Sequence, residues 1–451
     1  MAFTPDDLIP CLAEELKAHA TIWVGFSGGL DSTVLLVAVF RLLGTHQAAE
    51  RLRALHINHG LSPRAEQWQR HCEGLCQSLG IKWVSEQLKL PPKSGASLED
   101  LARKARYEVY RRHLQTGDCL LLGHHQDDQV ETLLYRLLRG AGPRGLAAIP
   151  PRRKLGRGTL IRPLLPFPRR DIETFARAEK LSWIEDESNL DPAFDRNFLR
   201  HEIFPRLEQR WPGFRKTWQR SAELCREADV LLQQLAARDF SQVATRFPER
   251  LNIRALEVLP EINQRNLLRF WLDEFCATSD IPAPDHRTLK RILSEVVGAA
   301  ADAAPVVSWS GEGGRVQVRR YGAELYILKA GAAAPQAVFV WDLKAPLDMG
   351  AGLGCLRLQK VSAGGFRLES IDSIRVAFRK GGEKAKPSGR KTRPLKKILQ
   401  DYRIPPWLRD KLPLCYVGDE LLAVADLFIC DPWRCESGDE LWRIVWERPA
   451  G

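Results

Sequence analysis

The chain has 451 residues, enough for roughly three domains, and its 44% apolar and 27% charged residues exclude a fibrous or disordered protein. No apolar run approaches the roughly 20 residues of a membrane span, and the N-terminal segment lacks the features of a signal peptide, so we expect a cytoplasmic protein with no membrane partner. The net charge of +11 favours an anionic partner, and the ten scattered cysteines, which form no C-x-x-C pair, fit a reducing compartment.

The first informative segment is residues 21–32, TIWVGFSGGLDS, which predicts a short buried strand, a small-residue loop and the start of a helix. Adjacent glycines bring backbone N–H groups close to a ligand, and the helix adds unpaired N–H groups and a positive dipole end. This arrangement favours a phosphate, although the Gly-Lys pair of the common nucleotide loop is absent. Asp31 suits such a loop if it binds Mg²⁺ that bridges to the phosphates. The same pattern also fits an ordinary strand–helix turn capped by Asp or Ser.

Short strands and helices alternate up to about residue 215, which predicts a parallel, doubly wound sheet with helices on both faces. In such sheets ligands bind at the carboxyl ends of the strands, and both the glycine loop and the pair His124-His125 follow a predicted strand. The further strands are expected at residues 52–58, 81–88, 119–123 and 159–165. The helices are expected at residues 66–79, 97–114, 127–138 and 171–180.

The rest of the chain changes character twice. Residues 141–158 are rich in Gly, Pro and Arg and predict a long loop. The pattern is helical over about 216–297, short strands follow near 316–320 and 324–328, and 331–337 has the composition of a linker. The expected domains are an α/β domain at 1–215, a mainly helical domain at 216–330 and a small α+β domain at 338–451.

The segment GHHQDDQVET places His124 and His125 at the end of a predicted strand, and Asp127, Asp128 and Glu131 near the start of a helix. Acids at a helix start are ordinary dipole partners. This density of titratable groups also fits a site in which carboxylates hold Mg²⁺ or a cationic substrate and a histidine donates to a developing negative charge. Zinc is less favoured, since no cysteine or third histidine lies nearby in the sequence.

Two basic segments suggest contacts with phosphates. Arg196 and Arg200 are four residues apart on a predicted helix face, which fits either phosphate binding or a salt-bridged surface. Nine of the 19 residues in 379–397 are Lys or Arg, only Glu383 is acidic, and Gly and Pro keep the segment extended. It leads into an amphipathic helix and a Pro-Pro turn followed by Trp407, a combination that favours RNA over small anions.

Together these motifs resemble those of the tRNA(Ile)-lysidine synthetase family. SGGLDS is similar to the SGG-x-DS pyrophosphatase loop that this family shares with other N-type ATP pyrophosphatases, such as GMP synthetase and the tRNA thiolases. The resemblance narrows to the lysidine enzymes through HHQDDQVET, IRPLL, DESNLDPAFDRNFLRH and the basic segment from RKGGEK to IPPWLR. It covers most of residues 20–210 and 375–430, whereas the middle of the chain is similar only in its helical character.

The resemblance implies an ATP-dependent C–N ligation on tRNA(Ile) with a CAU anticodon. ATP would adenylate the C2 carbonyl oxygen of the first anticodon cytidine with release of pyrophosphate. The ε-amine of free L-lysine would then attack C2 and expel AMP. The product, lysidine, changes the codon specificity from AUG to AUA. The implied cofactors are ATP, which is consumed as a substrate, and Mg²⁺.

The resemblance also implies roles for individual residues. The catalytic residues would be Asp31, Asp128 and His124. Asp31 would serve Mg²⁺, Asp128 would hold the lysine ammonium or magnesium, and His124 would contact the ATP phosphates. The expected nucleotide-binding residues are Ser27, Gly28, Gly29, Leu30, Asp31, Ser32 and Arg106. The expected RNA-binding residues are Arg196, Arg200, Arg379, Lys380, Lys384, Arg390, Lys396, Lys397 and Arg409.

Three other functions are weighed against this one. The nearest alternative is a tRNA thiolase, which has the same loop and a polyanionic partner but normally needs paired cysteines or a persulfide site. A glutamine-dependent amidotransferase is less favoured because Ala2 follows Met1, so that processing would expose no cysteine nucleophile. A non-catalytic RNA-binding protein with a relic nucleotide site would not be expected to keep SGGLDS and HHQDDQVET intact.

Overall fold

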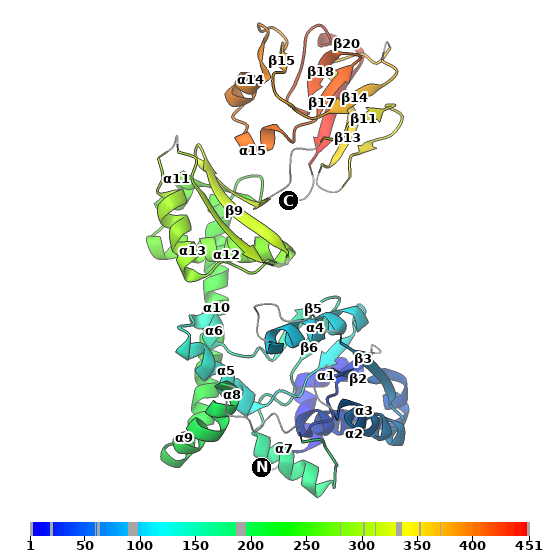
Figure 1. The fold of residues 1–451 in the computed structure, drawn as a ribbon, viewed down its shortest axis with the longest axis vertical. Coiled ribbons are helices and arrows are strands. Elements are labelled where there is room, and N and C mark those ends of the chain that lie inside the picture. The colour runs from blue at the N-terminus through cyan, green and yellow to red at the C-terminus, as the bar shows by residue number, and fades with distance from the viewer. Residues whose placement is uncertain are drawn as a thin grey trace. The chain divides into compact units, whose positions relative to one another are not determined.

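The structure is a computed structural model of the 451-residue chain, drawn as a ribbon in Figure 1. It divides into two compact units, Met1–Leu231 and Leu232–Gly451. The finer division into three domains stays a prediction. The structure describes residues 3–18, 21–58, 60, 64–88, 98–185, 195–279, 281–300, 303–311, 313–330, 336–350, 353–369 and 371–448.

Within its described residues, the first unit is built on a six-stranded sheet of order β3-β2-β1-β4-β6-β5. Neighbouring strands from β3 to β6 are parallel, and β5 runs antiparallel to β6 at the edge. The strands are β1 (Ile22–Gly25), β2 (Leu52–Asn58), β3 (Lys82–Gln87), β4 (Cys119–Leu121), β5 (Arg152–Leu155) and β6 (Gly158–Ile161). Parallel strands at the expected positions confirm the α/β class.

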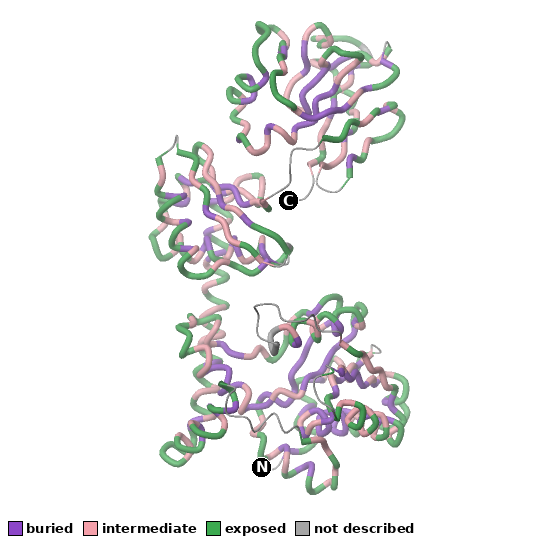
Figure 2. Tube along the Cα trace, viewed as in Figure 1, coloured by how far each residue is buried: buried purple, intermediate pink, exposed green. Residues whose placement is uncertain are grey.

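Helices cover both faces of this sheet. These helices are α1 (Ile9–Lys17), α2 (Leu30–Arg51), α3 (Ala65–Leu79), α4 (Leu98–His113) and α7 (Arg169–Ala178). Helix α5 (Gln126–Leu138) instead packs against the helical residues that follow 195. Because side chains alternate across a strand, Ala54 of β2 packs into the core with α2 and Leu55 into the core with α4. In β4, Leu121 packs into the same core as Ala54, and Leu120 packs into the same core as Leu55. The sheet is therefore doubly wound, as expected, and its strands are among the most buried parts of the unit (Figure 2).

Helix α2 begins directly behind the glycine loop and fills the centre of the unit. Its first three turns are almost wholly buried, and a glycine at position 44 with φ of 71° interrupts the helix near its end. Among the described residues, α2 is the one helix long and apolar enough to cross a membrane. However, 56% of that stretch is buried inside the protein, which is also true of core helices. The prediction of a buried helix after the loop is confirmed.

The long loop predicted at 141–158 is wrong. The segment contains the short helix α6 (Pro143–Leu146) and strand β5, which pairs with β6 in a hairpin. Pro143 suits the first turn of a helix, and Gly156 adopts a φ of 57° in the hairpin turn. The charged residues of β5 gave it a loop-like composition, although charge is common on an edge strand. The strand predicted at 159–165 ends at Ile161, because Pro163, two residues further on, has no N–H to donate to a neighbouring strand.

Some other expectations fall outside the described residues. The first residue of the helix predicted at 97–114, the part of the DESNLDPAFDRNFLRH motif at 186–194 and most of the linker at 331–337 cannot be compared with the structure for this reason. The helix at 66–79 is confirmed as α3, and Gly80 ends it in the left-handed conformation with φ of 66°.

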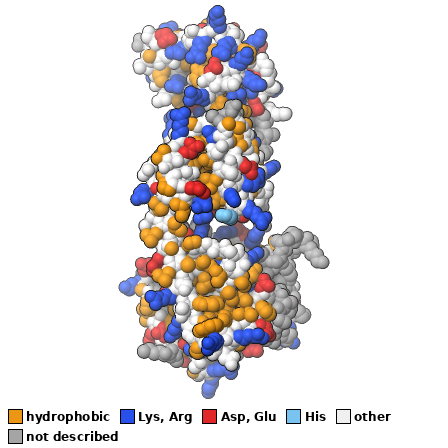
Figure 3. All heavy atoms as spheres, turned by 90° about the vertical axis from the view of Figure 1, so that its left-hand side faces the viewer, with side chains coloured by type: hydrophobic (Ala, Val, Ile, Leu, Met, Phe, Trp, Pro, Cys, Tyr) orange, Lys and Arg blue, Asp and Glu red, His pale blue; other side chains and the backbone are white. Residues whose placement is uncertain are grey.

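Three further helices complete the first unit. They are α8 (Asp195–Phe198), α9 (Phe204–Arg210) and the first part of α10 (Phe214–Val243), with π-helical residues Leu199–Ile203 between α8 and α9. The aromatic rings of Phe204, Phe214 and Trp218 pack together between α9 and α10. Apolar side chains also gather on the outer surface of the unit (Figure 3), and among the exposed ones are Trp211 and Leu231. The core thus leaves part of this apolar surface uncovered.

The second unit begins with a helical part that carries its own sheet. The helices are the last part of α10, α11 (Ile253–Val258), α12 (Glu261–Ser279) and α13 (His286–Arg291), which continues into a π-helix at Ile292–Val297. The antiparallel strands have the order β7-β10-β9-β8 in the described residues. They are β7 (Arg250–Asn252), β8 (Val306–Gly311), β9 (Gly314–Tyr321) and β10 (Glu324–Ala330). The sequence predicted β9 and β10 and missed β7, which has three residues, and β8.

The C-terminal part of the second unit is α+β, as expected. Its described residues form a five-stranded sheet β11-β14-β17-β18-β19, a three-stranded sheet β12-β13-β20 and the pair β15-β16. The helices are α14 (Leu395–Asp401) and α15 (Pro406–Arg409). The strands are β11 (Phe339–Trp341), β12 (Leu347–Asp348), β13 (Cys355–Gly365), β14 (Ile374–Ala377), β15 (Lys384–Ala385), β16 (Arg393–Pro394), β17 (Leu414–Val417), β18 (Glu420–Val424), β19 (Phe428–Ile429) and β20 (Cys435–Glu447).

Candidate active site

The glycine loop between β1 and α2 is held by its own serines. Ser32 Oγ accepts a hydrogen bond from Ser27 N at 3.3 Å and donates to Gly29 O at 3.0 Å. Gly29 N donates to Ser27 Oγ at 3.3 Å. Gly29 is the N-cap residue of α2 and therefore offers no side-chain cap. The alternative of a turn capped by Asp31 is not supported, and the N–H groups of the first turn of α2 remain available to an anion.

Gly28 is the position at which the loop requires glycine. Its φ is +82°, and an added Cβ would lie 2.5 Å from Ile184 Cδ1 and 2.6 Å from Cys72 Sγ. We expect Gly28→Ala to lower the free energy of unfolding by about 2 kcal/mol through backbone strain and overpacking. In Gly29→Ala the new Cβ would lie 3.5 Å from Ser27 Oγ, an ordinary contact, and we expect a loss below about 0.5 kcal/mol. Urea denaturation compares the two, and equal losses would contradict this account of the loop.

A second loop, between β4 and α5, lies against the first. A Cβ on Gly123 would approach the backbone C and O of Asp31 to 3.0 Å, so the two strand ends are in close contact. His125 is the N-cap residue of α5, and its backbone N donates to Asp128 Oδ2 at 2.9 Å. The imidazole of His125, whose side chain is 3% exposed, places Nε2 3.7 Å from Asp31 Oδ2 and 3.5 Å from Asp128 Oδ2. The structure thus brings Asp31 and Asp128 together around His125.

The two carboxylates of this cluster differ in their pKa. Burial raises the pKa of Asp31, with a further rise from the negative charge of Asp128, against the opposing effect of His125. Burial alone would also raise the pKa of Asp128, but the two histidines, the His125 N–H and Arg200 together hold it below its ordinary value. Among the described residues, Asp31 Oδ1 is buried without a hydrogen-bond partner. The protein environment therefore stabilises the ionised form of Asp128, whereas the ionised form of Asp31 lacks enough hydrogen bonds and positive charge to offset its burial.

Glu131 and Arg200 form a buried ion pair beside this cluster. Arg200 Nε and Nη2 donate to the two carboxylate oxygens of Glu131 at 2.8 and 3.0 Å, and Arg200 Nη2 lies 3.7 Å from Asp128 Oδ1. The Glu131 side chain is 1% exposed and that of Arg200 is 29% exposed. This pairing could not be predicted from the sequence, because the two residues are 69 positions apart. The pair makes Arg200 part of the site rather than part of the outer surface.

Asp127 lies at the other ring nitrogen of His125, with its Oδ2 3.7 Å from Nδ1, whereas Asp31 and Asp128 face Nε2. Its Oδ1 accepts from Arg215 Nε at 2.6 Å and its Oδ2 accepts from Arg169 N at 2.9 Å. Together with other contacts, these hold the pKa of Asp127 low against the opposing effect of burial. Asp127 therefore links α5 to α7 and α10, and this bracing fixes the start of α5.

His124 has a different environment from its neighbour. Its Nδ1 accepts a hydrogen bond from Arg162 Nε at 3.3 Å. Burial lowers the pKa of His124 to about 4, and the positive charge of Arg162 adds to the effect while Asp128 opposes it. His124 is therefore neutral at physiological pH, and it lies at the carboxyl end of β4 next to the first loop.

The low pKa of His124 predicts a pH effect on stability. The folded pKa lies below the ordinary value of 6.5, so the unfolded chain binds the proton more readily. The contribution of this group to stability is present above about pH 6.5 and is lost as the pH falls toward 4. We expect His124→Asn to flatten the pH dependence of the unfolding free energy in this window. His46→Asn serves as the control, because its side chain is 87% exposed. An unchanged dependence in His124→Asn would contradict a neutral His124.

The donor set around Asp31 fits magnesium better than a transition metal. Among the described residues, no group of three or more His, Cys, Asp or Glu side chains could hold a metal ion. Mg²⁺ is often held by one or two carboxylates together with substrate phosphates, and it does not need a complete protein cage. The unpartnered, buried Oδ1 of Asp31, at the end of a phosphate-binding loop, fits that mode.

Comparison with known proteins places the chain in a family. Residues 7–207 match the PP-loop domain, 251–326 the TilS substrate binding domain and 374–446 the TilS substrate C-terminal domain. The chain is 39% identical over 450 residues to a tRNA(Ile)-lysidine synthase of Coxiella burnetii, covering 99% of this chain and 97% of the relative. The chain belongs to the tRNA(Ile)-lysidine synthase family.

Other members of the tRNA(Ile)-lysidine synthase family match over a similar extent. The Legionella pneumophila strain Philadelphia 1 enzyme is 40% identical over 99% of both chains, and the Pseudomonas aeruginosa enzyme is 42% identical over 95% of this chain and 93% of its own. Among solved structures, a U34-tRNA thiolase from Methanococcus maripaludis with a 4Fe-4S cluster aligns with a TM-score of 0.41 at 19% identity. That alignment covers 49% of this chain and 78% of the thiolase chain.

The predicted nucleotide-binding residues lie mostly in one place. Residues 27–32 form the loop and the first turn of α2, as expected. Arg106 is exposed on α4, and it is the next residue, Tyr107, that contacts the site by accepting from Arg162 Nη2 at 3.3 Å. Arg162 was not predicted as a site residue. The signal for it was its position directly after a predicted strand, within the IRPLL motif.

The predicted RNA-binding residues fall into two groups. Arg196 is exposed on α8, and Lys380, Lys384, Arg390, Lys396 and Lys397 are exposed in the C-terminal domain of the family. Arg379 is half-buried, and its Nη1 donates to Asp410 at 3.0 Å. Arg409 is 6% exposed, and its Nε donates to Ile404 O at 2.8 Å. The exposed group is accessible to a polyanion, whereas Arg200, Arg379 and Arg409 are engaged within the protein.

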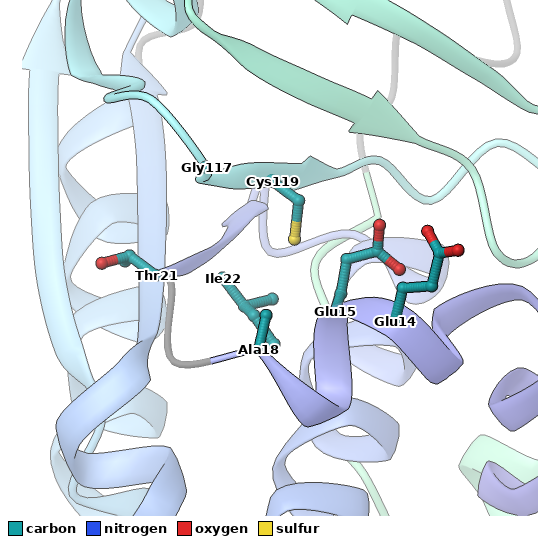
Figure 4. A pocket seen from close by; sticks show the side chains of 7 residues that line it. All are labelled: Glu14, Glu15, Ala18, Thr21, Ile22, Gly117 and Cys119. Carbon is teal, nitrogen blue, oxygen red and sulfur yellow. The ribbon is translucent and has the colours of Figure 1, made fainter.

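A separate small cavity lies at the opposite edge of the sheet. It has a volume of about 100 Å³ and is lined by the starts of β1 and β4 and by the end of α1 (Figure 4). Its lining residues are Glu14, Glu15, Ala18, Thr21, Ile22, Gly117 and Cys119. Because ligands of parallel sheets bind at the carboxyl ends of strands, this cavity is not the candidate active site.

Proposed function

We propose that the chain ligates free L-lysine to C2 of the first anticodon cytidine of tRNA(Ile), with ATP consumed and AMP and pyrophosphate released. The observation that carries this proposal is the match to tRNA(Ile)-lysidine synthases over nearly the whole length of both chains. The site supports it, because a phosphate-binding loop lies directly against a cluster of carboxylates at the same sheet edge.

In the first step the C2 carbonyl oxygen of cytidine attacks the α-phosphorus of ATP, and pyrophosphate leaves. The loop formed by Ser27, Gly28 and Gly29 would present the leaving pyrophosphate to the N–H groups of the first turn of α2 and to its positive end, since the N–H groups of Ser27 and Gly29 already donate within the loop. Mg²⁺ held by Asp31 would offset the phosphate charge when bound. His124, which is neutral, would donate its remaining N–H to negative charge that develops at the reacting phosphate.

In the second step the ε-amine of lysine attacks C2, the C2–O bond breaks and AMP leaves with that oxygen. Asp128 stays anionic and would hold the lysine ammonium before the amine loses its proton. Asp31 adds negative charge near the same position, whereas the carboxylate of Glu131 is paired with Arg200. Anionic side chains would therefore favour a cationic amine over sulfur donors, which are neutral or anionic.

The exposed lysines of the C-terminal domain would hold the tRNA by its phosphates. Lys396 and Lys397 lie next to each other on α14, and both are exposed. We expect Lys396→Ala/Lys397→Ala to weaken tRNA binding several-fold and to reduce the slope of log affinity against log salt by about 1.5, because two phosphate contacts are lost. Lys360→Ala, an exposed residue on β13 that is paired with Glu440, is the control. Filter binding at several salt concentrations measures both, and identical slopes for the two variants would count against this surface.

The proposal is tested by the nucleoside that the chain produces. The full chain is incubated with tRNA(Ile), ATP, Mg²⁺ and, in separate reactions, lysine, a sulfide donor or glutamine, and the digested tRNA is analysed by mass spectrometry. We expect a cytidine derivative heavier by lysine less one water, and only in the lysine reaction. A thiolated nucleoside would instead identify a tRNA thiolase, and an unmodified tRNA in all three reactions would refute the proposal.

A further inference from the structure

Arg162 follows β6 directly and is enclosed beside His124. The residue is 5% exposed. All three nitrogens of its guanidinium donate: Nε to His124 Nδ1 at 3.3 Å, Nη1 to Pro150 O at 2.6 Å and Nη2 to Tyr107 Oη at 3.3 Å. These partners belong to the β4–α5 turn, the segment before β5 and helix α4. One guanidinium therefore connects three separate elements at the carboxyl edge of the sheet.

The buried charge of Arg162 is not paired with a carboxylate among the described residues. Its pKa is lowered first by burial and further by the charges of Arg153 and Arg103, and the hydroxyl of Tyr107 opposes this lowering. Burying an unpaired cation costs free energy, so its position needs support from the hydrogen bonds that it makes. These three hydrogen bonds fix the orientation of the Arg162 guanidinium relative to His124, Pro150 and Tyr107.

The hydrogen bond from Arg162 determines which nitrogen of His124 carries the proton. An arginine has donors and no acceptor and remains charged in proteins, so His124 Nδ1 must be the acceptor. A neutral imidazole has one N–H, which must then be at Nε2. With Nδ1 directed at Arg162, Nε2 is directed away from it.

We propose that Arg162 is a positioning residue that holds His124 as the neutral Nε2–H tautomer, so that His124 acts as a hydrogen-bond donor in the adenylation step and not as a general base. The inference rests on the proposed function for the identity of that step. A histidine can act either as a hydrogen-bond donor or as a general base. The tautomer of His124 distinguishes these two roles. The proton stays on Nε2 throughout, and no bond to His124 forms or breaks.

The first test is the tautomer itself, measured in the full chain. Nitrogen-15 NMR of selectively labelled histidine distinguishes a protonated ring nitrogen from an unprotonated one, and the His124 signals are assigned by their absence in His124→Asn. We expect an unprotonated Nδ1 and a protonated Nε2 in the wild type. Arg162→Met should give a mixture of tautomers, and Arg162→Lys, which keeps a cationic donor, should retain the wild-type form. A protonated Nδ1 in the wild type would overturn the inference, even if a variant failed to fold.

The control for the NMR arm is Arg153→Met. Arg153 lies over the same Tyr107 ring, with its guanidinium carbon 4.8 Å from the ring centroid, and it also adds positive charge near Arg162. No described contact joins it to His124, so its loss should leave the His124 tautomer unchanged. An equal change in Arg153→Met and Arg162→Met would show a general loss of charge or packing and would contradict a specific role for Arg162.

The second test is a kinetic double-mutant cycle on pyrophosphate release. We expect Arg162→Met to lower kcat by about 10- to 100-fold with little change in KM for ATP or tRNA, because it disturbs only the contribution of His124. In the His124→Asn background the same change should have almost no further effect. A full additional loss in that background would show that Arg162 acts independently of His124. Failure of the wild type to make lysidine would overturn the proposed function, while the tautomer measurement would still decide this inference.

Discussion

Asp31→Asn is expected to abolish pyrophosphate release from ATP, by about 1,000-fold or more, while tRNA binding persists. Asp31 stands at the end of the phosphate loop with one carboxylate oxygen buried and unpartnered, and asparagine removes the charge that would hold Mg²⁺ there. Lys396 and Lys397, which we propose to bind tRNA, are in the other unit, so the variant should leave the affinity for tRNA unchanged. Pyrophosphate release and filter binding on the same preparation measure both quantities.

The same variant should not be less stable than the wild type. The pKa of Asp31 is raised by burial, so its ionisation favours the unfolded chain, and stability from this group is lost as the pH rises through the folded pKa. At neutral pH we therefore expect Asp31→Asn to unfold at the same free energy or a higher one. Asp6→Asn, which changes an exposed aspartate near the N-terminus, is the control for activity. Unchanged turnover in Asp31→Asn would refute the assignment of the loop.

Breaking the pair of Glu131 and Arg200 is expected to have the largest effect on stability. Arg200→Met leaves the carboxylate of Glu131 buried without its partner, and we expect a loss of about 3 kcal/mol in unfolding free energy. This is the lower end of the range for such pairs, because the Arg200 side chain is 29% exposed and solvent partly screens it. Chemical denaturation followed by circular dichroism measures the loss.

The control for Arg200 is an exposed pair in the same unit. Arg111→Met breaks the contact with Glu108 on α4, where both side chains are about half exposed, and it should cost no more than about 0.5 kcal/mol. Adding Glu131→Gln to Arg200→Met should recover part of the lost stability, since it removes the unpaired charge. Equal losses for Arg111→Met and Arg200→Met would contradict the buried pair.

The loop and the parallel sheet could be predicted because their signals are local. A run of β-branched and aromatic residues before Ser27, two glycines and an apolar stretch after them specify strand, turn and helix without any distant contact. The sequence pattern placed His124 and Asp128 just after a predicted strand. Because ligands bind at the carboxyl edge of such sheets, this position marked them as candidate site residues. The pattern thus located both halves of the site before their geometry was known.

The contacts that complete the site could not be predicted, because each depends on residues far apart in the chain. Arg200 had the same helical spacing from Arg196 that a phosphate-binding pair has, and only the fold shows that it meets Glu131. Arg409 follows a Pro-Pro turn in a basic region, yet its guanidinium is buried against a backbone carbonyl. Strand β5 was missed because an edge strand with charged residues has the composition of a loop.

Pyrophosphate is proposed to leave from the loop at 27–32 when lysine is joined to tRNA, and the stoichiometry of the products measures this coupling. The full chain is incubated with tRNA(Ile) bearing a CAU anticodon, ATP labelled separately in its α- and γ-phosphates, and labelled lysine. We expect pyrophosphate, AMP and tRNA-bound lysine in equal amounts, with all three lost in Asp31→Asn and retained in Asp6→Asn. Release of orthophosphate and ADP in place of pyrophosphate and AMP, or pyrophosphate release with no lysine on the tRNA, would contradict this expectation.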